Sequence, residues 1–483
     1  MHSQRLSALD ASFLEVETSA AHMHVGWIAV LEPPAGRAAP SFEQFRDHVA
    51  RRLHRAPRYR QRLARVPLGM GRPLWVDDER FDISHHVRRS TGCDLLELAG
   101  TVMSTPLSRE RPLWELWIAD QLDDGRVGVI GKAHHCMVDG IAAVELGALL
   151  LDVEPDAPPD EPDPWEPAPA PSAAGLLVGG VLDRARDQLR LASASARMAT
   201  APRRLVASVE RSGRALLHSL ARTAPVDRLN EPLSPYRHVG TLSCSLDELR
   251  LVKRAFGTTV NDVLLAAAAG GVRRYLERHE AEPQKLKAMV PVNVRAGGAG
   301  ELGNRIAFLF IELPCHDPDP LARLAAVHLA TREAKATGEP EGADAVLELA
   351  SYAPSPVQRM LSRIVASPST FNVVVSNIPG PTEQLYMLGC GLREAYPIVP
   401  LAERHGLSIG FTTVAGGAFF CVYADRDSVP DPDRLASEIG SALDELIQLA
   451  PSATGSRPKV ASRFGEHRGR RQARPGVADR AGN

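Results

Sequence analysis

The sequence predicts an α/β protein with two compact regions. Apolar runs of strand length, such as residues 23–31 and 127–130, alternate with stretches whose apolar residues recur at helical spacing. Eight prolines interleaved with acidic residues lie between Pro155 and Pro171 and separate the first region from the second. We therefore expect strands and helices in both regions, joined by an extended, exposed linker.

The composition narrows the class of protein. At 483 residues the chain is long enough for two or three domains, and its 44% apolar and 24% charged residues are typical of a globular protein. A net charge of −2 gives no overall attraction to nucleic acid, so no nucleic-acid partner is expected. The six cysteines show no CxxC or paired spacing, which favours free thiols in a reducing cytoplasm. The N-terminus has no apolar signal core, so secretion by a signal peptide is not expected. The sequence has no run of about 18 apolar residues, so a membrane span is not expected either.

The first region contains a short series of expected elements. Helices are expected at residues 41–53 and 94–103, and short strands at residues 73–76, 81–87 and 113–118. Seven arginines lie between residues 51 and 65. We favour a solvated basic helix face there over a contact with an anionic ligand.

Basic amphipathic helices are expected after the linker. Residues 173–222 carry two apolar stripes at helical spacing, and nine arginines against three acidic residues make the polar faces positive. Such helices either meet an anionic lipid surface or pack their stripes on the protein itself, and the sequence does not separate these two interpretations.

The second region has its own strands and helices. The expected strands are residues 240–244, 289–294, 306–313, 371–376, 407–413 and 418–423, and the expected helices are residues 246–255, 258–276 and 432–449. Asn261 and Asp262 stand at a helix N-terminus, where capping alone explains them. Beyond Pro451, eight Lys and Arg residues with Gly, Pro and Ser indicate a disordered basic tail.

The stretch richest in chemistry is GKAHHCMVDG, residues 131–140, between an apolar strand and a helix-forming run. Transfer of an acyl group to an alcohol needs a base of near-neutral pKa beside the hydroxyl, and histidine suits that task. On extended backbone, adjacent side chains point to opposite faces, so only one of two neighbouring histidines can face a cleft. We assign His135 as the base and His134 as its support.

The remaining polar residues of this stretch are expected to hold the loop. Asp139 is interpreted as a loop-holding carboxylate that pairs with Arg295, since a buried carboxylate needs a cation or several donors. Gly140 allows the tight exit into the following helix. A metal site is not expected, because adjacent histidines do not share a face and no Cys or carboxylate falls at ligand spacing nearby.

Several motifs together carry a family resemblance. They are LSALDASF at residues 6–13, MHVG at 23–26, PLWE at 112–115, HHCMVDG at 134–140, NDVLLA at 261–266, PVNVR at 291–295 and SNIPGP at 376–381. Over about residues 3–449 the chain resembles the bacterial wax ester synthase/acyl-CoA:diacylglycerol acyltransferase family. That family lies within the superfamily of chloramphenicol acetyltransferase and the condensation domains of peptide synthetases.

The resemblance implies a fold and a set of domains. Two chloramphenicol-acetyltransferase-like α/β domains are expected, each with a mixed sheet flanked by helices, and an active-site tunnel between them. Residues 1–154 would form the N-terminal acyltransferase domain and residues 239–450 the C-terminal one. Between them, residues 155–238 would hold the linker and the basic helices, and residues 451–483 would be the tail.

The resemblance also implies the chemistry. His135 would take the proton of the acceptor hydroxyl, and Asn261 and Asp262, which match the ND motif of the family, would support the active site. The expected function is transfer of a long-chain acyl group from acyl-CoA to diacylglycerol, giving triacylglycerol, or to a fatty alcohol, giving wax ester. Acyl-CoA would be a co-substrate and no cofactor, metal or covalent enzyme intermediate would be needed.

Two alternatives to this function stay open at this point. A non-catalytic lipid-binding or assembly protein could keep the same fold, although the intact histidines favour an enzyme. Condensation of carrier-protein thioesters is less favoured, because no carrier or adenylation domain accompanies the chain. The protein is expected in the cytoplasm, with peripheral contact to the inner membrane or to the surface of lipid droplets.

Overall fold

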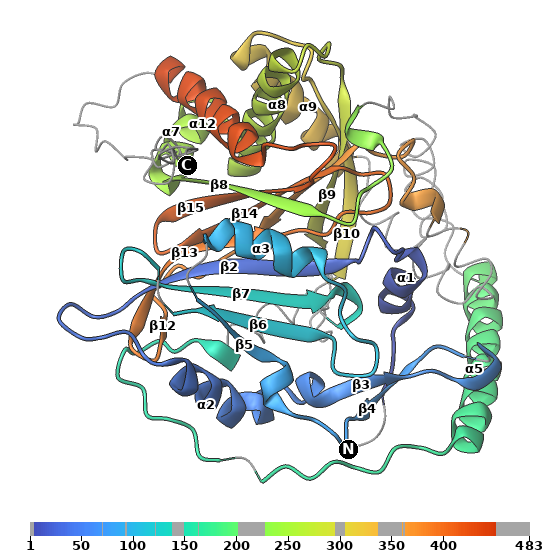
Figure 1. The fold of residues 1–483 in the computed structure, drawn as a ribbon. Helices are drawn as coiled ribbons and strands as arrows, with labels where there is room; N and C mark the ends of the chain where they lie inside the picture. The colour runs from blue at the N-terminus through green and yellow to red at the C-terminus, as the bar shows by residue number, and fades with distance from the viewer. Residues whose placement is uncertain are drawn as a thin grey trace, which may run out of the picture. The chain divides into compact units, whose positions relative to one another are not determined.

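Within the residues that the structure describes, two six-stranded sheets and one three-stranded sheet carry the fold, with helices packed beside them (Figure 1). All of these residues belong to one compact unit, Met1–Ala450. The predicted α/β class with mixed sheets is confirmed. The computed structural model describes residues 4–69, 71–91, 94–120, 122–137, 149–162, 164–200, 228–294, 305–336, 360 and 363–450.

The first large sheet has the strand order β12-β13-β2-β7-β6-β5. β5 and β6 run parallel and the other neighbours run antiparallel. Every residue of β7 is buried, which agrees with the apolar run at residues 127–130, and the buried residues include Lys132 and His134. The strands are β2 (His24–Glu32), β5 (Val87–Ser90), β6 (Trp114–Ala119), β7 (Val127–His134), β12 (Tyr386–Met387) and β13 (Cys390–Ile398).

The second large sheet has the strand order β10-β9-β11-β14-β15-β8. β11 runs parallel to β9 and β14, and the other neighbours run antiparallel. The strands predicted at residues 407–413 and 418–423 are confirmed as β14 and β15, which form a hairpin joined at Ala415 and Gly416, both with positive φ. The strands are β8 (Arg237–Ser245), β9 (Leu286–Val294), β10 (Arg305–Leu313), β11 (Val373–Ile378), β14 (Leu407–Val414) and β15 (Gly417–Asp425).

The small sheet consists of β1 (Gln4–Arg5), β4 (Leu74–Asp77) and β3 (Gln61–Ala64). The α-helices are α1 (Ala8–Val16), α2 (Phe42–Arg52), α3 (Leu95–Ser104), α5 (Ala173–Thr200), α7 (Leu246–Phe256), α8 (Val260–Arg278), α9 (Pro320–Ala336) and α12 (Pro432–Leu449). Short 3-10 helices are η1 (Leu53–Arg55), η2 (Pro57–Arg60), η3 (Pro67–Gly69), η4 (Ile83–His85), η5 (His135–Met137) and η6 (Arg228–Asn230).

Local sequence explains where several helices begin. Ser41, Ser245 and Thr259 each form a capping box, in which the side chain accepts a backbone N–H and the third helical residue bonds back. Among the described residues, no single helix has the length and apolar character of a membrane span. The bent pair α7 and α8 reaches that length together, with an angle of 101° between them, and most of α8 is buried in the core.

The two halves of the chain share a sheet. β12 and β13 come from the second half, yet β13 pairs antiparallel with β2 of the first half, from Gly391 opposite Glu32 to Ile398 opposite Gly26. Helix α3 also lies against the start of β8 so closely that a Cβ on Gly100 would come within 2.6 Å of the Arg237 carbonyl oxygen. The boundary predicted near residue 239 therefore divides the chain by sequence but not by sheet.

One predicted edge strand is wrong in its position. The sequence predicts a strand at residues 81–87, whereas the structure has η4 there and β5 begins at Val87. The Asp82 side chain accepts the backbone N–H of Ser84 at 2.8 Å, which turns the chain into a helical turn before the strand can start.

The arginine-rich stretch is not a solvated helix face, which corrects the prediction. Arg52 and Arg60 are only 2% and 6% exposed. The Arg52 guanidinium donates to both carboxylate oxygens of Asp152, at 2.8 and 2.9 Å, and Arg60 lies over the Trp165 ring. Arg52 and Arg60 thus contact residues that lie about one hundred positions further along the chain, which local charge patterning cannot reveal.

The proline-rich linker is largely exposed, but it is attached to the first half along its length. Asp160 pairs with Arg55 at 2.5 Å, and Trp165 packs edge-on against Phe81. The Ala168 backbone N–H donates to Asp77 at 3.0 Å. The expected exposed linker is therefore a fixed strap rather than a free tether.

We predict that Trp165→Ala accelerates proteolytic cleavage within residues 156–171, by about fivefold if the lost cation–π contact contributes about 1 kcal/mol. Limited proteolysis under native conditions, followed by mass spectrometry of the fragments, measures the rate. Trp117→Ala is the matched control, because Trp117 also stacks with an arginine, Arg88, at a site outside the linker. Equal cleavage rates in the two variants would show that Trp165 does not hold the strap.

Candidate active site

The two adjacent histidines lie where β7 ends. His134 is the last residue of β7 and stands opposite His24 of β2, and His135 opens η5. The change from strand to helical turn places the two side chains in different surroundings: His134 is 1% exposed, whereas His135 is partly exposed. Asp139 and Gly140, the other predicted residues of this motif, lie outside the described residues.

His134 is held by hydrogen bonds and charge. Its Nδ1 accepts the backbone N–H of Cys136 at 3.1 Å, so the neutral ring carries its proton on Nε2. Nε2 lies 3.8 Å from the Glu17 carboxylate and 3.4 Å from Arg109, and these two residues form an ion pair with each other. Burial, followed by the Arg109 charge, lowers the pKa of His134 to about 2, which keeps its ring neutral.

His135 is held by stacking and by its backbone. Its ring stacks on Phe13 of α1 with centroids 3.7 Å apart. The backbone N–H of His135 donates to the Met23 carbonyl at 2.9 Å. Its Nδ1 is buried with no hydrogen-bond partner on another described residue, and the polar group acting on this ring is its own backbone. Nε2 is therefore the ring nitrogen that can meet a substrate. Burial lowers the pKa of His135 to about 4, so at neutral pH the ring is in its proton-accepting form.

Three residues around this pair were not predicted as functional: Phe13, Glu17 and Arg109. Phe13 belongs to the LSALDASF motif and Arg109 lies three residues before PLWE, so their proximity to known motifs was the available signal. The contacts join positions more than one hundred residues apart for Phe13 and Glu17, which no spacing rule identifies.

Asp262 lies in the first turn of α8, where it takes part in the helix cap and accepts hydrogen bonds from α9. It is 1% exposed and accepts hydrogen bonds from the Thr259 N–H, His328 Nδ1 and the Thr331 hydroxyl at 2.9, 2.8 and 2.7 Å. Burial alone would raise the pKa of Asp262, but these donors outweigh it and lower the pKa.

These contacts tie α8 to α9 and do not reach the histidines. The role of Asp262 and its neighbour Asn261 as active-site supports stays a prediction. Arg295, the predicted partner of Asp139, lies outside the described residues.

Cys136 is not a competing nucleophile. Burial raises the pKa of its thiol to about 12, so the reactive thiolate is scarce at neutral pH although His135 is its neighbour in sequence. The five cysteines in the described part of the chain are free thiols, in agreement with the prediction for them.

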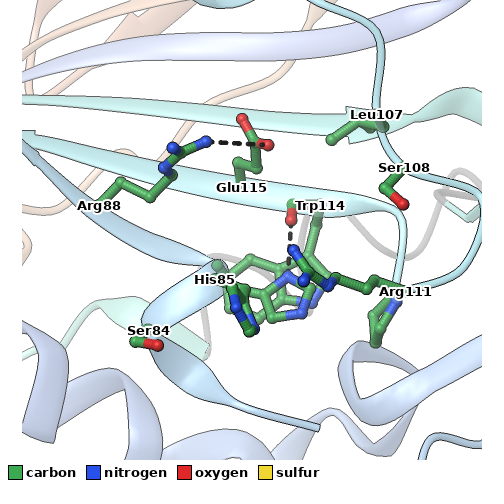
Figure 2. Close-up of a pocket in the computed structure, with 10 residues that line it drawn as sticks. Ser84, His85, Arg88, Leu107, Ser108, Arg111, Trp114 and Glu115 are labelled. Atoms are coloured by element: carbon green, nitrogen blue, oxygen red, sulfur yellow. Dashed lines mark hydrogen bonds and ion pairs between the residues drawn. The ribbon is translucent and has the colours of Figure 1, made fainter. Parts of the chain in front are cut away.

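A small polar pocket is lined by residues from the segments 84–88 and 107–112 and by Trp114 and Glu115, and neither His134 nor His135 belongs to its lining (Figure 2). Trp114 forms its floor with His86, whose ring stacks on the indole at 4.7 Å, and Trp114 is 3% exposed. Trp114 thus belongs to the apolar core of the first half. Glu115, also in the wall, is neutralised by Lys132 at 3.1 Å and Arg88 at 3.7 Å. This pocket adds no group to the His135 site.

Comparison with known proteins agrees with this arrangement. A sequence model described as the wax ester synthase/diacylglycerol acyltransferase catalytic domain matches residues 6–264, and one described as the WS/DGAT C-terminal domain matches residues 302–447. A Mycobacterium tuberculosis protein named as a probable diacylglycerol O-acyltransferase is 31% identical over 457 residues, which are 91% of this chain and 98% of that protein.

Solved structures show the same fold. The wax ester synthase/diacylglycerol acyltransferase from Marinobacter aquaeolei VT8 matches with a TM-score of 0.68 and 27% identity, over 92% of this chain and 99% of that one. The starter condensation domain of rhizomide synthetase, solved with C8-CoA and Leu-SNAC, shares the fold with a TM-score of 0.56 at 14% identity, over 94% and 95% of the two chains.

The fold is thus that of the Marinobacter acyltransferase, and it is shared with a condensation domain. With the catalytic family model matching more than half of its length, the chain belongs to the wax ester synthase/diacylglycerol acyltransferase family, a family of acyltransferases that use acyl-CoA. The predicted family resemblance is confirmed, and a non-catalytic lipid-binding role is not favoured.

We predict that Phe13→Ala moves the pH dependence of activity. Loss of the stacked ring lets water reach His135 and raises its pKa from about 4 toward the ordinary value of 6.5. Since activity requires the neutral ring, the acid limb of kcat/KM should shift to higher pH. Phe42→Ala, at a partly buried phenylalanine stacked with Arg46 on α2, should leave that limb in place. An unshifted limb in Phe13→Ala would contradict the assignment of His135 as the titrating base.

Proposed function

We propose that this protein transfers a long-chain acyl group from acyl-CoA to the hydroxyl of diacylglycerol, forming triacylglycerol, and that it also accepts fatty alcohols and forms wax esters. The observation that carries this proposal is the state of His135. Its ring stacks on Phe13 and its backbone N–H is held by the Met23 carbonyl. The ring is neutral at physiological pH, and among the described residues no hydrogen-bond partner occupies Nε2.

The reaction follows from one base used twice. His135 Nε2 takes the proton of the acceptor hydroxyl as the oxygen attacks the thioester carbonyl carbon. The tetrahedral intermediate collapses by breaking the carbon–sulfur bond, and the imidazolium returns the proton to the departing CoA thiolate. An ester and free CoA leave, and the histidine is neutral again. In this scheme acyl-CoA is the co-substrate and no further cofactor takes part.

The histidine pair divides the work. His134 accepts the Cys136 N–H and faces Glu17, so its ring fixes the turn that presents His135. The substrates would approach between the two halves of the chain, where the tunnel implied by the family is expected. The mycobacterial relative is named as a diacylglycerol O-acyltransferase, and this name supports diacylglycerol as the acceptor. The Marinobacter enzyme is named as both a wax ester synthase and a diacylglycerol acyltransferase, which supports a fatty alcohol as a second acceptor.

We predict that His135→Ala abolishes acyl transfer and leaves the fold intact, because a positioned general base contributes about 10²–10⁴-fold. Purified protein is incubated with radiolabelled palmitoyl-CoA and either diacylglycerol or a fatty alcohol, and the products are separated by thin-layer chromatography. His134→Ala is the companion variant and should lose less activity or lose stability. Full activity of His135→Ala with an unchanged circular dichroism spectrum would refute the mechanism, and the product ratio of the unmodified protein decides the acceptor.

The acceptor lipids are held in membranes or droplets, so the enzyme must reach a lipid surface, and α5 is the element suited to this. The stripe Val178, Val181, Leu182 and Leu189 is 61%, 48%, 51% and 70% exposed. Of the two interpretations left open by the sequence, packing of the stripe on the protein is not what these exposures support.

The first turns of α5 are attached to the protein. Leu176 packs against the apolar cluster of Val66, Leu74 and Val76, and Asp183 pairs with Arg5 of β1 at 2.5 Å. The apolar stripe of the same helix is exposed, and the helix lies at the edge of the first half (Figure 1). An exposed apolar stripe beside basic residues is the pattern of a helix that lies in a membrane interface. We propose that the protein lies in the cytoplasm and makes peripheral contact with the inner membrane or lipid droplets through α5.

We predict that the protein floats with anionic liposomes at low salt and less so as ionic strength rises, since each basic residue near such a surface adds about 1 kcal/mol of attraction. The triple change Val181→Ser, Leu182→Ser, Leu189→Ser should weaken binding by about tenfold or more. Leu329→Ser is the control, because Leu329 is an equally exposed leucine, at 58%, on α9. Arg203, Arg204, Arg211 and Arg214, which lie outside the described residues, are the arginines whose change to Gln should flatten the salt dependence. Binding that ignores the triple change would rule out α5 as the lipid contact.

A further inference from the structure

The turn before β2 supports the proposed base directly. The Met23 carbonyl accepts the backbone N–H of His135 at 2.9 Å. To present that carbonyl, Met23 adopts a φ of +50°, which is unfavourable for a residue with a side chain, and it is 6% exposed. A conformation of this kind persists only where the surrounding structure holds it in place.

Residues 18–22, which we name the support turn, are held together by Thr18. The Thr18 hydroxyl oxygen accepts the N–H groups of Ala20 and Ala21 at 3.3 and 2.9 Å, and the Thr18 N–H donates to the Ala21 carbonyl at 3.0 Å. Within the same turn, the His22 ring contacts the Ser19 carbonyl at 2.9 Å. The turn therefore has little internal freedom, and its position is set by what holds it from outside.

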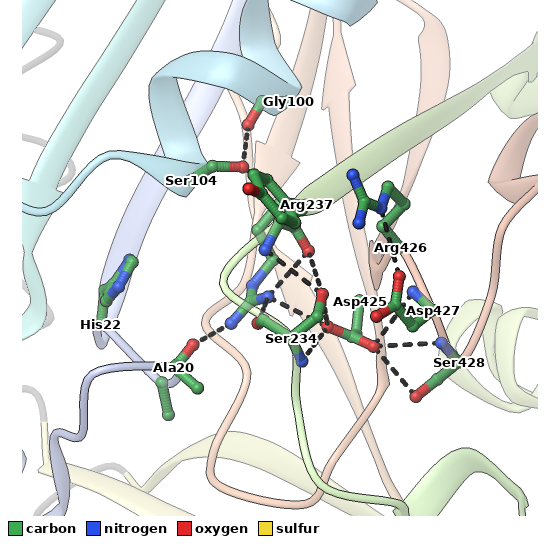
Figure 3. Close-up of polar contacts among 12 residues, drawn as sticks. Ala20, His22, Gly100, Ser104, Ser234, Arg237, Asp425, Arg426, Asp427 and Ser428 are labelled. Carbon is green, nitrogen blue, oxygen red and sulfur yellow. Dashed lines mark hydrogen bonds and ion pairs between the residues drawn. The ribbon is translucent and has the colours of Figure 1, made fainter.

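Two side chains from the second half hold the support turn. The Thr18 hydroxyl donates to the Glu403 carboxylate at 2.6 Å, and the Arg237 guanidinium donates to the Ala20 carbonyl. Figure 3 shows Arg237 reaching toward Ala20 from the network around Asp425. Both contacts join residues more than two hundred positions apart, so they are contacts between the two halves of the chain.

Arg237 is itself fixed. It is 3% exposed, and its guanidinium also donates to the carbonyls of Ser234 and Tyr236 and to Asp425 at 3.2 Å. Asp425 is 0% exposed and accepts further hydrogen bonds from Ser234 and Ser428. The Arg237 backbone N–H donates to Ser104 of α3 at 2.8 Å. A cation with so many fixed partners provides a rigid anchor for the Ala20 carbonyl.

We propose that Arg237 and the Thr18–Glu403 pair are positioning residues for His135, which act through the support turn and Met23. The proposal rests on the proposed function, in which His135 is the base. Its physical reason is that general-base catalysis requires the donor and acceptor atoms at hydrogen-bond distance, and a displacement of about 1 Å can cost about a hundredfold in rate. The second half thus contributes to catalysis through contacts that do not touch a substrate.

The test uses Thr18, because its side chain is exposed and its loss does not open the core. Thr18→Val keeps the shape of the side chain and removes the hydroxyl, and Thr18→Ser keeps the hydroxyl. We expect Thr18→Val to lower kcat by about tenfold or more, with KM for both substrates and the thermal midpoint unchanged, and Thr18→Ser to recover kcat. Thr101→Val removes an equally exposed hydroxyl from α3, where it bonds a helical carbonyl, and should leave kcat as it was.

Two further variants extend the test across the contact. Glu403→Ala should reproduce the loss in kcat, and Glu403→Gln, whose amide oxygen still accepts the Thr18 hydroxyl, should retain most of the activity. Arg237→Lys should lower kcat further, and if that variant does not fold, the Thr18 and Glu403 results decide alone.

The failure of this proposal is distinguishable from failure of the proposed function. Activity in His135→Ala would overturn both. An inactive His135→Ala together with Thr18→Val that keeps the full kcat would overturn the positioning role alone. A fall in kcat that Thr18→Ser shares would also overturn the positioning role. So would a fall in kcat that is accompanied by a fall in the thermal midpoint, because either result indicates a general loss of structure.

Discussion

The buried ion pair between Arg237 and Asp425 is the interaction on which the junction of the two halves depends. Taking two charges out of water is costly, and the pair is stable only because its remaining hydrogen-bonding groups are also satisfied. Ser234 and Ser428 donate to Asp425, while Arg237 donates to Asp425 and to carbonyls of both halves. Breaking such a pair by removing one partner typically costs about 3–5 kcal/mol. The pair therefore fixes the geometry of the junction more than it adds net stability.

Burial also sets the protonation state of the histidines. It lowers the pKa values of His24, His134 and His135, so the rings near the end of β7 stay uncharged at neutral pH. An uncharged imidazole is the form that can accept a proton, so the same burial that excludes water prepares the base. The cost appears at acid pH. Below about 6.5 the unfolded chain binds protons that the folded chain excludes until the much lower folded pKa values are reached, so stability falls as pH drops through that range.

The sequence predicts those parts of the fold and site that depend on local pattern. Apolar runs identified β2, β7, β14 and β15, and the HHxxxDG motif identified the histidine pair. What it could not predict are contacts between distant positions, such as Phe13 on His135, or Asp152 and Asp160 on the arginines of residues 51–65. Charge patterning within a window assigns those arginines to solvent, because their partners lie outside every window. Residue type alone also left the roles of Asp262 open, since one carboxylate can serve as a cap, a brace and an active-site support.

The strands β12 and β13 belong to the second half of the chain but lie in the sheet of the first half. This shared sheet adds a constraint that a division into two separate domains does not include. The central strand β2 lacks its neighbour on one side until residues 390–398 return to the first sheet, and the support turn just before β2 lacks Arg237 and Glu403 until the second half is in place. An unpaired edge beside a central strand is unstable and prone to pair wrongly. The N-terminal half therefore holds the proposed base but not all of the contacts that position it. The position of the proposed base thus depends on contacts from both halves of the chain.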